Sequence, residues 1–432
     1  MKSVKKCFVL IIVLALFTTS VFAIESAPQI SASSAVLVEP SSGEIIYEKK
    51  PHEKAYPAST TKMMTALIAM EKGNLNDVVK INETAIDDLE SMGSGANLHA
   101  GESYTLHDLL YLLLLSSEND AANAIAEHIA GSQSAFVDLM NERAEQIGMK
   151  DTHFANPHGL HDENHYTSAY DLYLLAKEGL KNKLFAEITS TSRTLINNKE
   201  VLTTNHLISR FKDPSYYYSY ASGIKTGFTT PAGYCLASTA ERNKVRYICV
   251  VMGSKKDETT GKIGSFVDSK ALYEWAFSNY EKKTLLSKST PVKEISVKYA
   301  KDKDYLVLTP ETDLVSLVPK DLDASKLTFD CKINSEVAAP VKKGEVLGSV
   351  TVLDGDKNFG TIKLVAMNDV NRSTFLYILS RVKNFFTGIV FKILGAAVIL
   401  LAAALLIIRG FNLRRRRRYN HRTRYDGSHR RR

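Results

Sequence analysis

The body of the chain shows two different patterns of hydrophobic and polar residues, one before and one after residue 283. Between residues 27 and 280, strand and helix patterns are mixed, beginning with apolar runs at 35–38 and 44–47 that flank a turn-rich segment and predict a hairpin. Segments with helical spacing follow at 60–72, 106–115, 121–130, 134–148 and 169–179. Two further strands are predicted at 233–239 and 245–253, before a helix near 266–277. This order of elements predicts an α+β fold in which helices pack on an antiparallel sheet.

The second pattern begins after residue 283. Short alternating runs, separated by turn residues, lie near 294–298, 305–308, 327–329 and 348–352. Such runs predict strands, and no cluster of titratable residues stands out among them. We therefore expect residues 24–282 to form the domain that carries the chemistry, and residues 284–370 to form a small all-β domain with no chemistry of its own.

The two ends of the chain have the composition of targeting and membrane segments. Residues 1–23 show early lysines, an apolar run and a small-residue end, the layout of a secretory signal cut after Ala23; an uncleaved anchor or a buried helix is the alternative. Residues 385–408 form an apolar segment whose only charge is Lys392, long enough to span a bilayer as a helix. The arginine-rich tail at 409–432 follows at once, so the positive-inside rule places the tail in the cytoplasm and the body outside. The same tail also suits contact with acidic lipid.

Charge and cysteine usage fit this topology. The net charge of +8 belongs to the ends, because residues 409–432 contain eleven arginines and one aspartate, which leaves a mildly acidic body. An acidic body offers no phosphate-binding face, so we expect no nucleic-acid partner. Beyond Cys7 only Cys235, Cys249 and Cys331 remain, which is not a disulfide framework. A turn near residues 242–243 would place Cys235 almost opposite Cys249, so a bridge stays open, although buried free thiols are favoured.

The first candidate for chemistry is Ser59-Thr60-Thr61-Lys62 at the start of the first predicted helix. Spacing of i to i+3 places the Lys62 amine over the Ser59 hydroxyl. The helix start adds free backbone N–H groups that favour an oxyanion. A lysine acts as a base only when neutral, and burial with a second cation nearby lowers its pKa. A capped helix with a solvated lysine is the alternative.

Two further strings complete the candidate site. Ser117-Glu118-Asn119 ends one apolar helix and starts the next, a rigid place from which Ser117 can relay a proton and Asn119 can bond the substrate backbone. Lys225-Thr226-Gly227 precedes the two paired strands. There the glycine permits a peptide backbone to lie close, and Lys225 and Thr226 suit a terminal carboxylate. Lys225 is also the natural second cation for Lys62. Helix capping and a loop glycine are the alternatives.

These strings resemble the three signature elements of the penicillin-recognising serine enzymes. The flanking residues, in 56–63, 119–122, 156–160 and 223–227, resemble those of the low-molecular-mass D-alanyl-D-alanine carboxypeptidases. The resemblance covers residues 30–280 and implies a β-lactamase/transpeptidase-like domain, in which Ser59 is the acylated nucleophile and Lys62 its base. It further implies that Ser117 and Asn119 form the second element, that Lys225 binds the carboxylate, and that the backbone N–H groups of Ser59 and Phe228 form the oxyanion hole.

The same resemblance implies the partners. Peptidoglycan stem peptides are the expected substrates and β-lactams the expected covalent inhibitors, at the outer face of the cytoplasmic membrane and without a cofactor. Three positions depart from the family pattern. Phe228 stands where some members have histidine, Glu118 puts an extra acid beside the site, and Lys262 or Ser265 stands where the last helix often begins with arginine. The last departure leaves open how a second contact to the carboxylate is made.

Other functions are compatible with parts of the sequence. A β-lactamase on the same fold would need an extra base for deacylation, and a non-enzymatic cell-wall-binding protein would not need all three elements intact. Four histidines between residues 153 and 165 invite a zinc site, but they lie in a turn-rich segment without a ligand-bearing helix, so no metal is expected. The tyrosines in 216–220 would line a groove or, as the favoured alternative, pack a half-buried hairpin.

Overall fold

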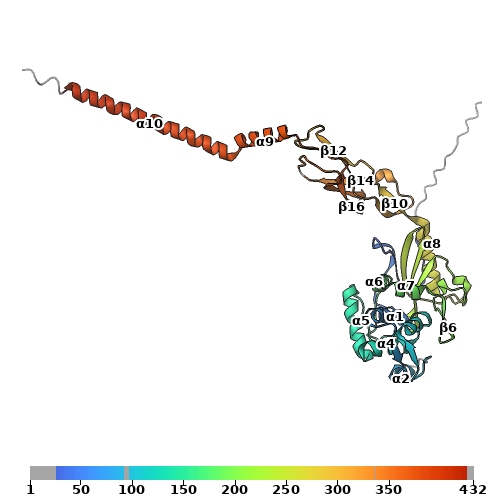
Figure 1. Cartoon of the computed structure of the whole chain (residues 1–432). Helices are drawn as coiled ribbons and strands as arrows, with labels where there is room; N and C mark the ends of the chain where they lie inside the picture. Colours follow the sequence, from blue (N-terminus) through green and yellow to red (C-terminus); the bar gives the residue numbers. More distant parts are fainter. Residues whose placement is uncertain (1–25, 92–96, 335, 426–432) are drawn as a thin grey trace, which may run out of the picture. The chain divides into compact units, whose positions relative to one another are not determined.

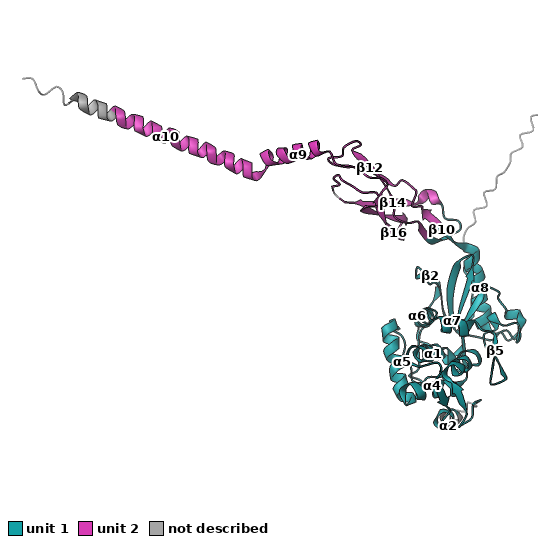
Figure 2. Cartoon of the chain, in the orientation of Figure 1, with its two compact units in different colours: residues 1–283, 316–323 teal, residues 284–315, 324–432 magenta. Residues whose placement is uncertain are grey.

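The computed structural model describes residues 26–91, 97–334 and 336–425, and the predicted signal segment 1–23 lies outside these ranges. The chain forms two compact units, each described here by itself. Unit 1 contains the residues up to Lys283 together with 316–323 (Figure 2). Unit 2 contains residues 284–315 and those from Ala324 onward.

Unit 1, drawn from blue to yellow in Figure 1, is built on a five-stranded antiparallel sheet in the order β2-β1-β9-β8-β7. Its strands are β1 (Ser34–Glu39), β2 (Glu44–Lys49), β7 (Ala221–Thr229), β8 (Gly233–Arg242) and β9 (Val245–Ser254). The hairpin β1–β2 and the pair β8–β9 are those that the sequence predicts. The turn between β8 and β9 falls at Asn243-Lys244, both with positive φ, as a tight two-residue turn requires. Strand β7 was not among the predicted strands.

Helices cover both faces of this sheet. Side chains of β1 alternate between two cores: Val36 and Val38 pack in the core of the first helical layer, and Ala35 and Leu37 pack in the core under α8. The helices are α1 (Lys62–Lys72), α2 (Thr84–Ser91), α3 (Leu106–Tyr111), α4 (Asn119–Ala130), α5 (Gln133–Ile147), α6 (Ala169–Gly179), α7 (Lys183–Ser190) and α8 (Gly264–Asn279). Two small hairpins complete the unit, β3 (Val78–Lys80) with β4 (Ser103–Thr105), and β5 (Arg193–Ile196) with β6 (Lys199–Leu202). The predicted α+β fold is confirmed.

Unit 2 contains the second predicted domain. Its main sheet has the order β11-β12-β16-β15-β14, with antiparallel neighbours. The strands of this sheet are β11 (Lys293–Ser296), β12 (Tyr305–Pro310), β14 (Thr328–Ile333), β15 (Val346–Asp354) and β16 (Lys357–Ala366). β10 (Tyr280–Leu286) pairs with β13 (Leu314–Pro319), and the division between the units falls within these two strands. Leu308, Val350 and Leu364 are fully buried in this sheet domain. The prediction of an all-β domain is confirmed.

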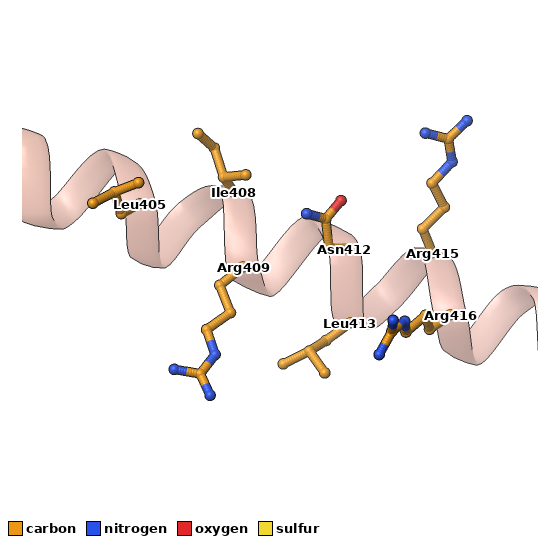
Figure 3. Close-up of a pocket in the computed structure, with 7 residues that line it drawn as sticks. All are labelled: Leu405, Ile408, Arg409, Asn412, Leu413, Arg415 and Arg416. Atoms are coloured by element: carbon orange, nitrogen blue, oxygen red, sulfur yellow. The ribbon is translucent and has the colours of Figure 1, made fainter.

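Two helices follow the β domain. α9 (Thr374–Thr387) ends at Gly388, whose extended backbone breaks the helix, and α10 (Ile389–Tyr425) begins directly after it. Residues 385–387 therefore belong to α9, and the helix break at Gly388 falls inside the segment 385–408 that the sequence predicts to span the membrane. The stretch Ile389–Arg417 is long and apolar enough to cross a membrane. Figure 3 shows where its apolar character ends: Leu405 and Ile408 give way to Arg409, Arg415 and Arg416 on the same helix.

The cysteines of unit 1 do not face each other. Cys249 on β9 pairs in register with Ser238, whereas Cys235 on β8 pairs with Gly227. Both thiols are free and buried, as is favoured from the sequence, and the expectation that they lie almost opposite one another is wrong. The reason is that the turn falls one residue later than expected, at Asn243-Lys244, so that Cys249 pairs with Ser238. The two thiols also lie on opposite faces of the sheet, because Cys235 belongs to the first core and Cys249 to the second.

Candidate active site

Ser59 lies on a tight turn directly before α1. The residues Ala58–Thr61 form a 3₁₀ turn, and Ala58 takes a left-handed φ of 47°, which costs a non-glycine residue about 1 kcal/mol. Strand β7 packs against this turn at Gly227, where an added Cβ would lie 2.8 Å from the Pro57 carbonyl oxygen and 3.0 Å from the Ser59 nitrogen. Only glycine at position 227 lets β7 lie this close to the Ser59 turn. The sequence did not indicate this reason for the glycine.

Lys62 is the first residue of α1 and its side chain is completely buried. Its Nζ lies 2.9 Å from Ser59 Oγ, 2.6 Å from Asn119 Oδ1 and 2.7 Å from the backbone oxygen of His158. Burial lowers the pKa of Lys62 well below its usual value, and the charge of Lys225 lowers this pKa further. The environment thus favours the uncharged amine beside the Ser59 hydroxyl.

The Ser117–Asn119 segment joins two buried helices, as the sequence predicts. Ser117 ends a π-helical turn, Leu112–Ser116, with a left-handed φ of 70°, and Asn119 starts α4. This bend places Ser117 on the wall of the same cavity as Ser59 and directs Asn119 Oδ1 to Lys62. Asp120 anchors the bend from behind, because its carboxylate accepts hydrogen bonds from the backbone nitrogens of Asn97 and Leu98 at 2.7 and 2.8 Å.

Glu118 lies between these two functional residues and hydrogen-bonds to the Asn97 side chain. Burial raises the pKa of its carboxyl group. Its charge in turn opposes the lowering of the pKa of both buried lysines, Lys62 and Lys225. The extra acid noted in the sequence therefore lies close enough to raise the pKa of both lysines of the site.

Lys225 and Thr226 lie on β7, the edge strand of the sheet. Lys225 is 1% exposed, its Nζ donates to the backbone oxygen of Thr226 at 3.1 Å, and burial lowers its pKa to about 7. The Thr226 hydroxyl lies 2.6 Å from that of Thr204. Phe228, two residues further along the strand, is half exposed and packs on Tyr234 with ring centroids 4.5 Å apart.

These elements surround one cavity of about 290 Å³. It is lined by Ser59, Ser117, Thr204, His206, Thr226, Gly227, Phe228, Tyr234, Cys235, Ile263, Ser265 and Phe266. Residues from all three sequence strings take part, and this size suits a small peptide end. The sequence did not indicate Thr204 or His206, which come from an irregular segment without any motif, nor the backbone oxygen of His158 as a partner of Lys62.

Two of the four histidines between residues 153 and 165, His158 and His165, contact the residues next to Ser59. His165 Nε2 lies 2.7 Å from the Thr61 hydroxyl, and the backbone of His158 receives the Lys62 amine. Burial lowers the pKa of His158 and His165, so both rings are neutral at pH 7. Among the residues that the structure describes, no group of three suitable side chains is placed to hold a metal ion.

The tyrosine-rich segment packs against the second core of unit 1. Tyr216 and Tyr218 are buried, and Tyr218 stacks on Tyr273 of α8 at 6.0 Å. The segment is not a hairpin, because a 3₁₀ turn (Pro214–Tyr216) is followed by a second turn at Ser219-Tyr220 directly before β7. Packing was the favoured alternative, and it is the one observed for these two side chains.

Fold and site together define a class of protein. An antiparallel sheet with helices on both faces brings together a serine, a buried lysine one turn later, a Ser-x-Asn bend and a Lys-Thr-Gly edge strand, which is the arrangement of the penicillin-recognising serine hydrolases. Residues 22–256 match the family described as D-alanyl-D-alanine carboxypeptidase, and residues 280–372 match the C-terminal domain of penicillin-binding protein 5. The chain belongs to this family of serine carboxypeptidases, of low molecular mass and penicillin-binding type, as its motifs predict.

Individual relatives support this assignment over nearly the whole chain. D-alanyl-D-alanine carboxypeptidase DacF of Bacillus subtilis is 33% identical over 88% of this chain and 98% of its own length. D-alanyl-D-alanine carboxypeptidase DacA of Haemophilus influenzae is 33% identical over 80% of this chain and 87% of its own length. The crystal structure of penicillin-binding protein 5 from Haemophilus influenzae has 32% identity and a TM-score of 0.62, covering 81% of this chain and all of that one.

Proposed function

We propose that this protein removes the terminal D-alanine from peptidoglycan stem peptides through an acyl-enzyme formed on Ser59. The observation that carries the proposal is the 2.9 Å contact between Ser59 Oγ and the fully buried amine of Lys62. The neutral amine takes the hydroxyl proton while Oγ attacks the carbonyl carbon of the penultimate residue. The C–N bond then breaks, the leaving amine takes a proton relayed by Ser117, and water hydrolyses the ester.

The hydrogen-bond arrangement around Lys62 agrees with an uncharged base. Two of its three partners, Asn119 Oδ1 and the His158 carbonyl, can only accept, and the third is a hydroxyl that can also donate. A neutral amine has two N–H donors for the first pair and one lone pair for the hydroxyl proton. The same geometry therefore supplies an acceptor for the proton of Ser59 at the moment of attack.

The remaining residues of the site bind the substrate in this proposal. The Ser59 turn lies against Gly227, so the backbone nitrogens of Ser59 and Phe228 are suited to form the oxyanion hole. Lys225 and Thr226 receive the terminal carboxylate, and Asn119 contacts the peptide on the acyl side. β-Lactams, which carry a comparable acyl group and carboxylate, would acylate the same Ser59 hydroxyl.

We further propose that the protein works at the outer face of the cytoplasmic membrane. Its α10 helix is suited by length and composition to span the bilayer, and the arginines at its end favour the cytoplasmic side. With the predicted signal at residues 1–23, this topology would expose the catalytic unit to the cell wall.

One experiment tests the nucleophile and the reaction together. Labelled penicillin, followed by peptide mapping, should place a covalent label on Ser59, and Ser59→Ala should abolish it. Mass spectrometry of stem peptides should show the loss of one D-alanine from the wild-type protein alone. A Ser59→Ala protein that still forms the adduct would refute the assignment. Rapid turnover of penicillin would indicate a β-lactamase instead.

A further inference from the structure

One end of the active-site cavity is formed by residues that the catalytic proposal leaves without a role. Thr204 is linked directly to Thr226 by their 2.6 Å hydroxyl contact, and next to it the cavity is lined by His206, Ser265 and Phe266. This end therefore adjoins the hydroxyl that we assign to the terminal carboxylate. Among the described residues that line the cavity there is no arginine and no lysine. Helix α8 begins here with Gly264-Ser265, where the family pattern often has arginine.

The ring of His206 is held rigidly at this wall. It stacks on Phe266 with centroids 5.0 Å apart and planes at 7°, and it contacts Tyr216 at 5.6 Å. The segment that carries it is fixed by Asn205, whose side chain accepts from the Leu207 nitrogen at 3.0 Å. A side chain held in this way can bind a ligand without losing further rotamer freedom on binding.

The same ring has hydrogen-bonding capacity that the protein does not use. Its Nδ1 is buried and has no hydrogen-bond partner in the described part of the chain. Because this atom is enclosed by protein, a ligand in the cavity meets another part of the His206 ring. No hydrogen bond at Nδ1 fixes the tautomer, so the proton of the neutral ring can lie on Nε2. Burial lowers the pKa of His206, with Lys212 as the next cause and Asp213 opposing, so the ring is neutral at pH 7 and can donate one N–H.

We propose that His206, with the hydroxyls of Thr204 and Ser265, binds the terminal carboxylate of the leaving D-amino acid in place of an arginine. This inference rests on the proposed function, because it concerns the same substrate in the same cavity. It makes His206 a specificity-determining residue that favours peptides with a free C-terminus. Phe266 and Ile263 close this end of the cavity with apolar walls, so the leaving residue should have a small side chain.

The test compares two substrates with the full-length protein in detergent. One is an acyl-D-alanyl-D-alanine peptide with a free terminal carboxylate, and the other is the same peptide with a terminal amide. His206→Ala should lower kcat/KM for the free acid about ten- to hundredfold, the loss expected for one hydrogen bond to a charged group, and should change the amide less than about twofold. His206→Gln keeps an N–H donor and should recover part of the preference.

A matched control and two contrary outcomes make the test decisive. His52→Ala removes an exposed histidine paired with Asp151, away from the cavity lining, and should leave both substrates unaffected. Equal losses for acid and amide in His206→Ala would mean that the ring only supports the fold, and an unchanged preference would mean that it contacts no carboxylate; either result overturns the inference alone. A wild-type protein that cleaves neither peptide and forms no penicillin adduct overturns the proposed function as well.

Discussion

Gly159→Ala should displace the nucleophile without touching any catalytic side chain. Gly159 has a φ of +89°, and a Cβ built there would lie 2.0 Å from the carbonyl oxygen of Ala58, the residue before Ser59. The left-handed backbone alone costs a non-glycine residue about 1–2 kcal/mol. Relieving the overlap requires the Ala58 peptide to move by about 1 Å, and forced shifts of this kind typically cost about 1–3 kcal/mol more.

A second glycine separates these two contributions. Gly148, at the end of α5, has nearly the same φ of +87°, but a Cβ there would meet nothing within 4 Å. In thermal unfolding, Gly148→Ala should therefore lose only the stability that the left-handed backbone costs, about 1–2 kcal/mol, and fluorescent penicillin should acylate it at the normal rate. Gly159→Ala should lose about 1–3 kcal/mol more and acylate about 100-fold more slowly, because Ser59 moves out of line with Lys62. Equal stability losses in the two variants, with acylation intact, would refute the claim that this contact fixes Ser59.

Three further predictions follow from the buried groups and the C-terminal helices. Burial lowers the pKa of Lys225 to about 7, so this side chain loses its charge as the pH rises through 7. The KM for a free-acid peptide should therefore increase above pH 7. A KM that stays constant from pH 6 to 9 would contradict the binding of the carboxylate by Lys225. Cys235 and Cys249 are buried, and burial raises their pKa values to about 11 and about 12. Burial also raises the pKa of Cys331, but this thiol is partly exposed, so Ellman's reagent should detect one thiol in the native ectodomain and three in guanidinium. Removal of residues 373–432 should shift the protein from the membrane pellet to the supernatant on ultracentrifugation, and continued pelleting would argue against α10 as the anchor.

Those parts of the fold that depend on local pattern could be predicted from the sequence. Helix α6 has the predicted bounds, and the hairpin turn at 243–244 lies within one residue of its expected place. Strand β7 could not be predicted, because Gly223, Lys225 and Gly227 interrupt the apolar alternation. It exists through pairing with β8, which supplies the tertiary context that overrides a weak local preference.

The candidate site shows the same division. Local pattern was enough to place Ser59 and Lys62 one turn apart at a helix start and Ser117 at the junction of two helices. The family resemblance, and not the spacing, led us to expect these strings in one site. Thr204 and His206 could not be found in this way. Their segment has no periodicity, and its position depends on long-range contacts such as the 2.9 Å hydrogen bond from the Thr204 nitrogen to the Leu115 oxygen.

The position of β7 at the edge of the sheet connects the fold to the reaction. One side of this strand pairs with β8, and no other strand among the described residues pairs with its second side. An extended peptide can therefore add to β7 as a further strand, with its carbonyl near Phe228 and its end near Thr226. No side chain fits at position 227, because the Ser59 turn already occupies the space that it would fill. A larger residue at 227 would push the Ser59 turn away from β7. Under the proposed mechanism, this would separate the nucleophile from the strand that holds the substrate, so the absence of a side chain at 227 couples substrate alignment to attack.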